Sequence, residues 1–277
     1  MTEKEIKDKL KSINDTVKIT KAMQMLSTTR SYRTQKNEDA AKKYFDSFDA
    51  AVDNVFKADD QDCRLFHEGD GQTVFVVVGG DKGLCGDYNN AVFAVADKEI
   101  ASVDGKVKIY SVGYVTREYY KSKGVHADGS FVHIIAEPSV KDACKIAETL
   151  VESFKNDNVK EVKIVYTRYT GNSTKVFCEK LLPYDRKTNE NENSTVILGK
   201  VDLETLLKQH LTAKIYYMIT TASNAVNYKR MVAMQEATAN GEEMVDELTK
   251  AYNRTRQNKI TNELNDSVAV LFRKKYE

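Results

Sequence analysis

The two ends of the chain are long stretches without proline, and this feature constrains the fold most. The prolines of the sequence, Pro138 and Pro183, both lie in its middle. The stretch from Asp202 to Glu277 has one glycine, Gly241. As a single helix it would extend roughly 110 Å, at about 1.5 Å per residue. A helix of that length needs a partner along its side, and the stretch from Thr2 to Lys57 is the obvious candidate.

Hydrophobic spacing supports a pairing of these two helices. Thr2 and Glu5 form a T-x-x-E capping box at the start of the first helix. Apolar residues then recur every three or four positions in both stretches, which is typical of a left-handed coiled coil. Gly241 costs about 1 kcal/mol relative to alanine inside a helix, which favours a close helix approach there, with a tolerated glycine as the alternative. The predicted seam consists of Ile6, Leu10, Ile13, Val17, Met231, Met234, Val245, Leu248 and Tyr252, with Thr238, Gly241 and Thr255 at further seam positions.

The middle of the chain alternates strand-like and helix-like segments. The β-branched run Thr73–Val78 predicts a buried strand. Further strands are predicted at Val107–Gly113, at Phe131–Ile135, and over the adjacent segments 159–170 and 174–183. Helices are predicted over 88–103, over 114–124 with Gly124 at the end, and from Pro138 to Asn156, where Ser139 and Asp142 form a cap. A loop is expected over 185–194, and a short strand or an entry segment to the next helix over 195–198.

This order of strands and helices predicts an α/β fold with a largely parallel sheet. We expect a long antiparallel coiled coil formed by the N- and C-terminal helices, and a central Rossmann-like α/β domain. The expected boundaries are residues 1–58 for the first coiled-coil helix, 59–200 for the central domain and 201–277 for the second coiled-coil helix.

Composition excludes several classes of function. A net charge of +1 with 30% charged residues indicates a soluble protein and gives little support to nucleic-acid binding. No run approaches the roughly 20 apolar residues of a membrane helix, and the charged N-terminus is unlike a secretion signal. The four histidines are dispersed and belong to no hydrolytic motif. The cysteines Cys63, Cys85, Cys144 and Cys178 are too scattered for a metal site, so we expect no metal and no cofactor.

A glycine-rich loop, GGDKGLCGDYN at Gly79–Asn89, lies between a predicted strand and a predicted helix. Phosphate-binding loops occupy such places. The loop nevertheless fits neither the P-loop pattern nor the dinucleotide-binding pattern, because no Ser or Thr follows Lys82 and Gly83 at the metal-ligand position. A structural turn or a docking surface is the favoured interpretation, and nucleotide binding remains the alternative.

Two cationic stretches lie on the predicted helices, one formed by Lys18, Lys21, Arg30 and Arg33 and the other by Lys250, Arg254, Arg256 and Lys259. A solvated helix face is the simplest interpretation of such a run. Nucleic-acid binding and an acidic protein partner are the alternatives that the pattern itself leaves open.

Three separated segments resemble the γ subunit of F-type ATP synthases. KITKAMQMLSTTR at residues 18–30 is similar to that family's K-I-T-K-A-M-x-M-V-A-A. The glycine-rich loop is similar to its S-D-[RK]-G-L-C-G-G-[FY]-N. RMVAMQEATANGEEMVDELTKAYNRTRQNKITNEL at residues 230–264 is similar to its R-M-x-A-M-x-x-A-T-x-N-A…L-x-x-x-Y-N-x-x-R-Q-x-x-I-T-x-E-L. The order and spacing of the three segments make this resemblance specific.

The resemblance implies a central-stalk rotor that couples ion-driven rotation of a membrane c-ring to conformational cycling of the αβ catalytic sites. Its implied partners are the α and β subunits, the ε subunit and the c-ring. It also implies a non-catalytic subunit, held peripherally on the cytoplasmic face of a bacterial plasma membrane. The residues implied to face the α/β ring are Lys18, Lys21, Met23, Arg254, Arg256, Gln257 and Thr261, and those of the loop at the stalk base are Lys82, Gly83, Leu84, Cys85, Gly86 and Tyr88.

Two departures from the family pattern stand out. The chain ends in a charged tail with Arg273, Lys274 and Lys275, where family members often have an apolar tip. Asn224 replaces a usual acid, which puts an ion pair there in doubt. Two rival functions are an α/β signalling domain that dimerises through its coiled-coil arm, and a nucleotide-dependent enzyme that uses the glycine-rich loop.

Overall fold

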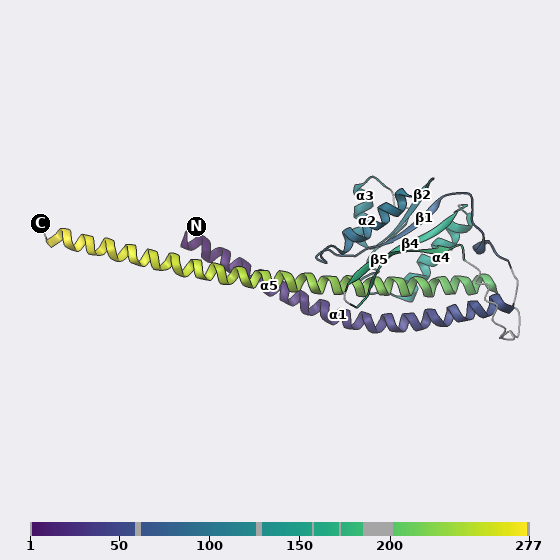
Figure 1. The fold of residues 1–277 in the computed structure, drawn as a ribbon, viewed down its shortest axis with the longest axis horizontal. Coiled ribbons are helices and arrows are strands. Elements are labelled where there is room, and N and C mark those ends of the chain that lie inside the picture. Colours follow the sequence, from purple (N-terminus) through teal and green to yellow (C-terminus); the bar gives the residue numbers. More distant parts are fainter. Residues whose placement is uncertain are drawn as a thin grey trace. The chain divides into compact units, whose positions relative to one another are not determined.

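Two long helices run through both of the compact units into which the chain divides. The computed structural model describes residues 2–58, 62–125, 129–156, 158–171, 173–184 and 202–275, with the side chains of 57, 58 and 269–275 outside that description. One unit comprises residues 1–26 and 231–277, and the other comprises residues 27–230. Helix α1 spans Glu3–Ala58 and helix α5 spans Leu203–Lys275 (Figure 1). The prediction of a long helix at each end of the chain is confirmed.

The capping box predicted at the start of α1 is present. The backbone N–H of Thr2 donates to Oε2 of Glu5 at 2.9 Å, and the backbone N–H of Glu5 donates to Oγ1 of Thr2 at 3.3 Å. The two side chains therefore satisfy backbone donors that have no partner within the helix.

In the first unit, α1 and α5 pair in antiparallel directions. Lys259 lies beside Glu3 at 3.2 Å, whereas the Oγ1 atoms of Thr238 and Thr20 are 2.8 Å apart. Residue numbers thus fall along α5 as they rise along α1.

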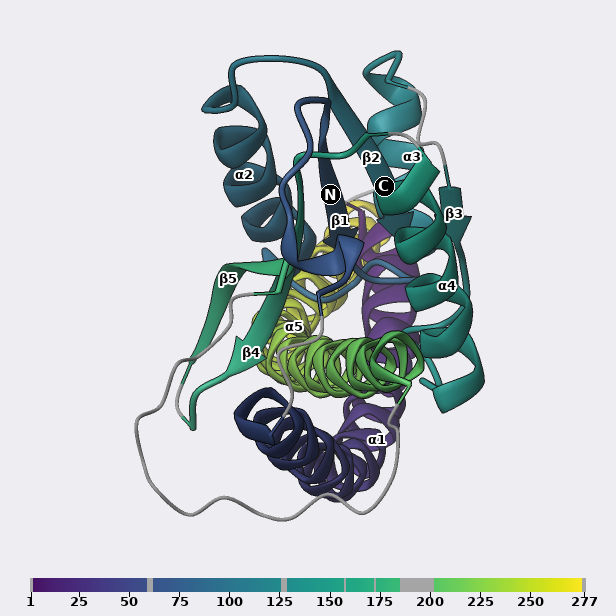
Figure 2. The ribbon, with the colours of Figure 1, turned by 90° about the vertical axis from the view of Figure 1, so that its right-hand side faces the viewer.

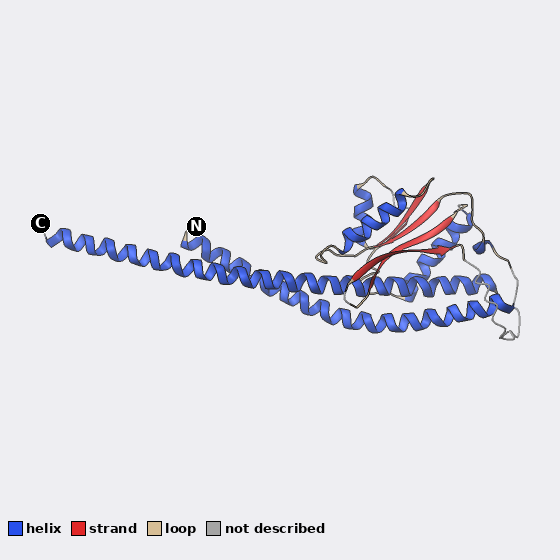
Figure 3. Cartoon of the chain, in the orientation of Figure 1, coloured by secondary structure: helices blue, strands red, loops and turns tan. Residues whose placement is uncertain are grey.

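The second unit is built on one largely parallel sheet, as predicted. Its strands are β1 (Thr73–Val78), β2 (Val107–Val112), β3 (Gly129–Phe131), β4 (Glu161–Tyr169) and β5 (Thr174–Leu182). They are arranged in the order β3-β2-β1-β4-β5, with β5 antiparallel to β4 and the other neighbours parallel. Figure 3 draws the strands of this sheet in red. Every residue of β1 is buried, which explains its uninterrupted apolar run.

Helices cover both faces of this sheet. Helices α2 (Tyr88–Ala101) and α3 (Tyr114–Ser122) lie on one face, and α4 (Val140–Asn156) lies on the other (Figure 2). The part of α5 that belongs to this unit also covers the face of α4, and α1 packs against the far side of α5 (Figure 2). A short 3-10 helix, Arg64–Phe66, precedes β1.

One predicted strand is wrong in its position. The strand expected at Phe131–Ile135 ends at Phe131, because His133 has a φ of 63° and the chain turns there. The backbone N–H groups of His133 and Ala136 donate to the carboxylate of Asp81 at 2.8 and 3.1 Å instead of to a strand. The loop expected over 185–194 and the strand expected over 195–198 lie outside the described residues.

Candidate functional site

The paired helices of the first unit bury a narrow seam. Ile6, Met234 and Thr238 are buried, and the remaining residues assigned to the seam are half-buried. The two helices approach each other closely at Gly241, where an added Cβ would lie 2.5 Å from Cγ2 of Val17. Besides Ile6, the buried residues of this helix pair are Met234, which has a flexible side chain, and Thr238, which is polar. Thr238 is 7% exposed and bonds to Thr20.

The residues implied to face a ring of partner subunits are mostly exposed. Lys18 pairs with Asp15 one turn away at 3.1 Å, and Lys21 lies 3.9 Å from Glu242. Met23 is half-buried, unlike the other residues of this set. The exposed members on α5 are Arg254, Arg256, Gln257 and Thr261, of which Thr261 donates to the backbone carbonyl of Gln257 at 3.0 Å.

The structure does not bring these residues together in one patch. Lys21 lies beside Glu242, whereas Lys259, just beyond Arg256, lies beside Glu3. Arg254 is 12 residues from Glu242 along α5, which corresponds to roughly 18 Å at about 1.5 Å per residue. The helix pair therefore carries two separate cationic stretches rather than one site. Arg30 and Arg33, grouped with Lys18 by sequence, belong to the second unit.

The glycine-rich loop joins β1 to α2 and is fixed by its own hydrogen bonds. The N–H of Gly80 donates to Oδ1 of Asn89 at 2.8 Å, and Nδ2 of Asn89 lies 3.4 Å from Sγ of Cys85. Leu84 and Gly86 have φ angles of 58° and 59°, a region that costs a residue with a side chain extra energy. Leu84 is nevertheless 64% exposed, so the strained backbone presents an apolar side chain outward.

Asp81 occupies the place where an anion would bind near this loop. Its carboxylate accepts hydrogen bonds from the backbone N–H groups of Tyr114 at 3.1 Å, His133 at 2.8 Å and Ala136 at 3.1 Å. Tyr114 is the first residue of α3, so the carboxylate sits at a helix N-terminus, which favours negative charge. A phosphate at that position would have to displace a side chain already bound there.

The loop is tied to α5 within the second unit. Lys229 bonds to Asp87 at 2.9 Å, and this hydrogen bond lowers the pKa of the Asp87 carboxyl. The guanidinium of Arg230 donates to the carbonyl oxygens of Gly83 at 3.4 Å and Lys82 at 3.5 Å. Burial, together with repulsion from Arg30, lowers the pKa of Arg230. Of the loop residues named from sequence, Lys82 and Gly83 are therefore joined to α5 through their backbone carbonyls.

Burial within this contact keeps two further groups neutral. The hydroxyl of Tyr88 donates to the carbonyl of Ala222 at 3.3 Å, and burial raises the pKa of Tyr88. Burial also raises the pKa of the Cys85 thiol, which is 1% exposed. A buried neutral thiol is a packing group rather than a nucleophile. Lys82 and Gly83, in contrast, are exposed.

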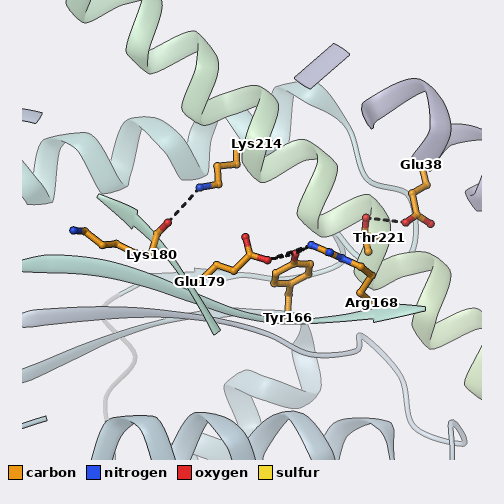
Figure 4. A network of polar contacts seen from close by, with 7 residues as sticks. All are labelled: Glu38, Tyr166, Arg168, Glu179, Lys180, Lys214 and Thr221. Atoms are coloured by element: carbon orange, nitrogen blue, oxygen red, sulfur yellow. Dashed lines mark hydrogen bonds and ion pairs between the residues drawn. The ribbon is translucent and has the colours of Figure 1, made fainter. Parts of the chain in front are cut away.

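Asn224 occupies a polar layer between α1 and α5 in the second unit. Its Nδ2 donates to Oε2 of Glu38 at 2.7 Å, and its Oδ1 accepts from Ser31 at 3.2 Å and Thr34 at 3.4 Å. Thr221 donates to the same Glu38 at 3.1 Å (Figure 4). The ion pair that the family's usual acid suggested is thus replaced here by hydrogen bonds of a neutral amide to the carboxylate of Glu38.

Sequence reasoning missed Asp81 and Asn224 as the groups that organise these contacts. The signal for Asp81 was its place inside the glycine-rich loop, three residues after the buried strand β1, but its three partners are 33 to 55 residues away. In the part of the chain that the structure describes, no cluster of three or more His, Cys, Asp or Glu side chains is arranged to hold a metal ion. No described helix is long and apolar enough to cross a membrane.

Comparison with known proteins identifies similar chains over almost the full length. A family model described as ATP synthase matches residues 2–269. The ATP synthase gamma chain of Glaesserella parasuis is 32% identical, over 96% of this chain and 97% of that protein. The ATP synthase gamma chain of Caldanaerobacter subterraneus is 30% identical, over 95% of this chain and 97% of that protein.

Solved structures are similar in fold. A chain of the Euglena gracilis mitochondrial ATP synthase, from its OSCP/F1/c-ring assembly, aligns with a TM-score of 0.69 at 15% identity and covers 98% of this chain and 93% of that chain. A chain of the central stalk and c-ring of the Tetrahymena thermophila enzyme aligns with a TM-score of 0.61 at 18% identity and covers 79% and 99%. At these identities the likeness concerns the fold alone.

Proposed function

This chain belongs to the ATP synthase gamma chain family, and on that premise we propose that it is the central-stalk rotor of an F-type ATP synthase. In this role it couples ion-driven rotation of a membrane c-ring to conformational cycling of the αβ catalytic sites, for ATP synthesis or hydrolysis. The observation that carries the proposal is the match of nearly the whole chain to gamma chains, including both helices of the antiparallel pair.

The chain acts by contact rather than by chemistry of its own. A rotor whose surface differs around its axis contacts each catalytic site differently and shifts that site between open and closed states. The contacts have to be released at every step, and exposed charge pairs worth about 0–1 kcal/mol suit this requirement. The exposed Lys18, Lys21, Arg254 and Arg256 are of this kind. In the glycine-rich loop, the carboxylate of Asp81 fills the position where an anion would bind. This agrees with catalytic sites that lie on other subunits.

The partners follow from this role. We assign the helix pair of the first unit to the ring of α and β subunits, with Lys18, Lys21, Met23, Arg254, Arg256, Gln257 and Thr261 as the contacting residues.

We assign the loop of Lys82, Gly83, Leu84, Cys85, Gly86 and Tyr88 to the base of the stalk, near the ε subunit and the c-ring. The exposed Leu84 supports this assignment, because a strained loop that presents an apolar side chain gains from a partner surface. The protein is then a peripheral subunit on the cytoplasmic face of a bacterial plasma membrane.

A pull-down of the tagged chain from its native membranes in mild detergent tests this function. We expect the α and β subunits to be recovered together with ε, in a complex that hydrolyses ATP. Recovery of the chain alone, or as a homodimer, would contradict the rotor and favour the coiled-coil signalling protein.

Nucleotide titration tests the enzymatic alternative. We expect isothermal titration calorimetry to detect no nucleotide binding by the full-length chain. Nucleotide binding that is present in the wild-type chain and lost in Lys82→Ala would place a nucleotide site in the glycine-rich loop and would contradict the structural role given to Asp81.

A further inference from the structure

His210 on α5 is a buried imidazole that links three segments of the second unit. The residue is 5% exposed. Its Nε2 lies 3.1 Å from Oδ1 of Asp49 on α1, and its Nδ1 lies 3.1 Å from the hydroxyl oxygen of Tyr184, which follows β5. The rings of Phe45 and Tyr184 lie 5.3 and 5.4 Å from the imidazole and hold it in place.

The hydrogen-bond partners of the ring tie its charge to the direction of one hydroxyl. A carboxylate only accepts hydrogen bonds, so Nε2 of His210 carries a proton that it donates to Asp49. The hydroxyl of Tyr184 also lies 2.9 Å from the carbonyl oxygen of Leu207, to which it donates. Its single proton is then committed, and its oxygen accepts from Nδ1 of His210. In this arrangement both ring nitrogens carry protons, and the ring is an imidazolium.

A neutral ring requires the Tyr184 hydroxyl to turn. The hydroxyl then donates to Nδ1 of His210, and the extra hydrogen bond to the Leu207 carbonyl is lost. Every group of the ring keeps a partner in both states, but only the protonated ring forms an ion pair with Asp49. Burial raises the pKa of Tyr184, so its hydroxyl stays protonated in the neutral range and the imidazole is the group that titrates.

Water has room to reach this cluster. A cavity of about 390 Å³ adjoins His210, compared with about 30 Å³ for one water molecule in the liquid. Two of its cations have partners of their own: Arg168 bonds to Glu179 at 3.2 Å, and Lys214 donates to the carbonyl of Lys180 at 3.3 Å (Figure 4). The charged and titratable groups that line the cavity are Asp49 and Asp53 from α1, Tyr166, Arg168, Glu179, Lys180 and Tyr184 from β4, β5 and the segment after it, and His210, Lys214 and Tyr217 from α5.

We propose that His210 is a pH-responsive link between α1 and α5. With both protons it holds Asp49 and Tyr184 at once, and on losing one proton it gives up the ion pair with Asp49. Burial by itself opposes a charge on the His210 ring, and in this proposal the carboxylate of Asp49 outweighs burial. A proton bound more tightly in the folded chain stabilises that chain fully below the unfolded value of about 6.5, and this stabilisation is lost as the pH rises through the folded midpoint. The segment of α1 from Phe45 to Phe56 is then held more firmly in acid than in base.

The test is a pH titration of the full chain by NMR, with nitrogen-15 in the histidine rings. We expect both ring nitrogens of His210 to show imidazolium shifts at about pH 7. In Asp49→Asn, which keeps the shape and removes the charge, we expect the His210 midpoint to fall by about one pH unit. Amide hydrogen exchange near Asp49 should rise across the same midpoint in the wild-type chain.

His67 provides the matched control. Its Nε2 contacts Asp62 at 2.7 Å, but both side chains are well exposed, so solvent weakens the pair. We expect Asp62→Asn to move the His67 signals less than Asp49→Asn moves those of His210. A neutral His210 ring at about pH 7, or an unchanged midpoint in Asp49→Asn, would overturn the proposal. If that variant does not fold, the ring shifts of the wild-type chain decide the question by themselves.

Discussion

Asn224 makes contacts that a carboxylate at the same position would lose. It is 3% exposed and donates to Glu38 while it accepts from Ser31 and Thr34. A side chain that both donates and accepts is required here, and an amide meets this requirement. The departure from the family's usual acid is therefore matched to Glu38.

We predict that Asn224→Asp destabilises the chain by about 2–3 kcal/mol at neutral pH, because it buries a second carboxylate beside Glu38. Equilibrium unfolding in urea measures this change. This loss of stability should be smaller in acid, because protonation of one of the two carboxyl groups restores a hydrogen-bond donor between them. Asn240→Asp is the control, since Asn240 is exposed on the same helix. Equal effects of the two substitutions would contradict the role of the polar layer.

Asp81→Ala is predicted to destabilise the second unit by about 2–3 kcal/mol, because three backbone N–H groups lose their acceptor. In the same variant, the hydrogen-exchange rates of the backbone amides of Tyr114, His133 and Ala136 should rise. Asp104→Ala, at an exposed loop position, is the control. Unchanged protection of these amides in Asp81→Ala would show that the carboxylate does not organise the loop.

At the scale of elements, the helix pair has one position where the usual preference for alanine is reversed. An alanine in place of a helical glycine stabilises by about 1 kcal/mol when space allows. At Gly241 the new Cβ would lie 2.5 Å from Cγ2 of Val17, a stiff β-branched side chain. We predict that Gly241→Ala destabilises the pair by about 1–2 kcal/mol net, measured by urea unfolding.

The double substitution Val17→Ala with Gly241→Ala separates the clash from the helix preference. Once Val17 is shortened, the alanine at 241 has space, and the double variant should be more stable than Val17→Ala alone by about 1 kcal/mol. A Gly241→Ala single variant that is more stable than the wild-type chain would show that the helices do not meet closely at this point.

Helices α2 and α3 are joined by Asp97, and this contact depends on pH. Burial alone would raise the pKa of the Asp97 carboxyl, but hydrogen bonds from Lys123, Tyr119 and Tyr120 outweigh burial and lower the pKa. A lowered folded pKa contributes stability above the unfolded value of about 3.9, and this stability is lost as the pH falls through the folded value. We therefore predict that the difference in unfolding free energy between the wild-type chain and Asp97→Asn narrows below about pH 4. A difference independent of pH would contradict the assignment.

The elements were predictable where their signal is local. The β-branched run of β1, the cap formed by Ser139 and Asp142, and the T-x-x-E box of α1 are each contained within a few residues. The bend at His133 was not predictable, because it depends on Asp81, 52 residues earlier. The same holds for the candidate site: the residues of the glycine-rich loop were found from their motif, but Lys229 and Arg230, which fix the loop to α5, are about 140 residues further along the chain.

At the scale of the whole molecule, the cationic residues of α5 should affect coupling more than assembly. We predict that Arg254→Gln with Arg256→Gln leaves the α and β subunits in the purified complex but reduces ion-driven ATP synthesis several-fold in membrane vesicles, because exposed charges contribute little to binding. Lys141→Gln with Lys145→Gln, exposed on α4, is the control. Normal synthesis by the assembled arginine variant would refute this role.

The first unit is assembled from both ends of the chain, and this has a consequence for biosynthesis. Residues 3–26 are synthesised before residues 231–275, their helical partner. About 200 residues lie between them, which corresponds to roughly 10–40 s of translation at about 5–20 residues per second. During this interval Ile6, Leu10 and Ile13 lack the helix that covers them in the folded chain, so the nascent first helix is exposed to chaperones, proteases and wrong associations.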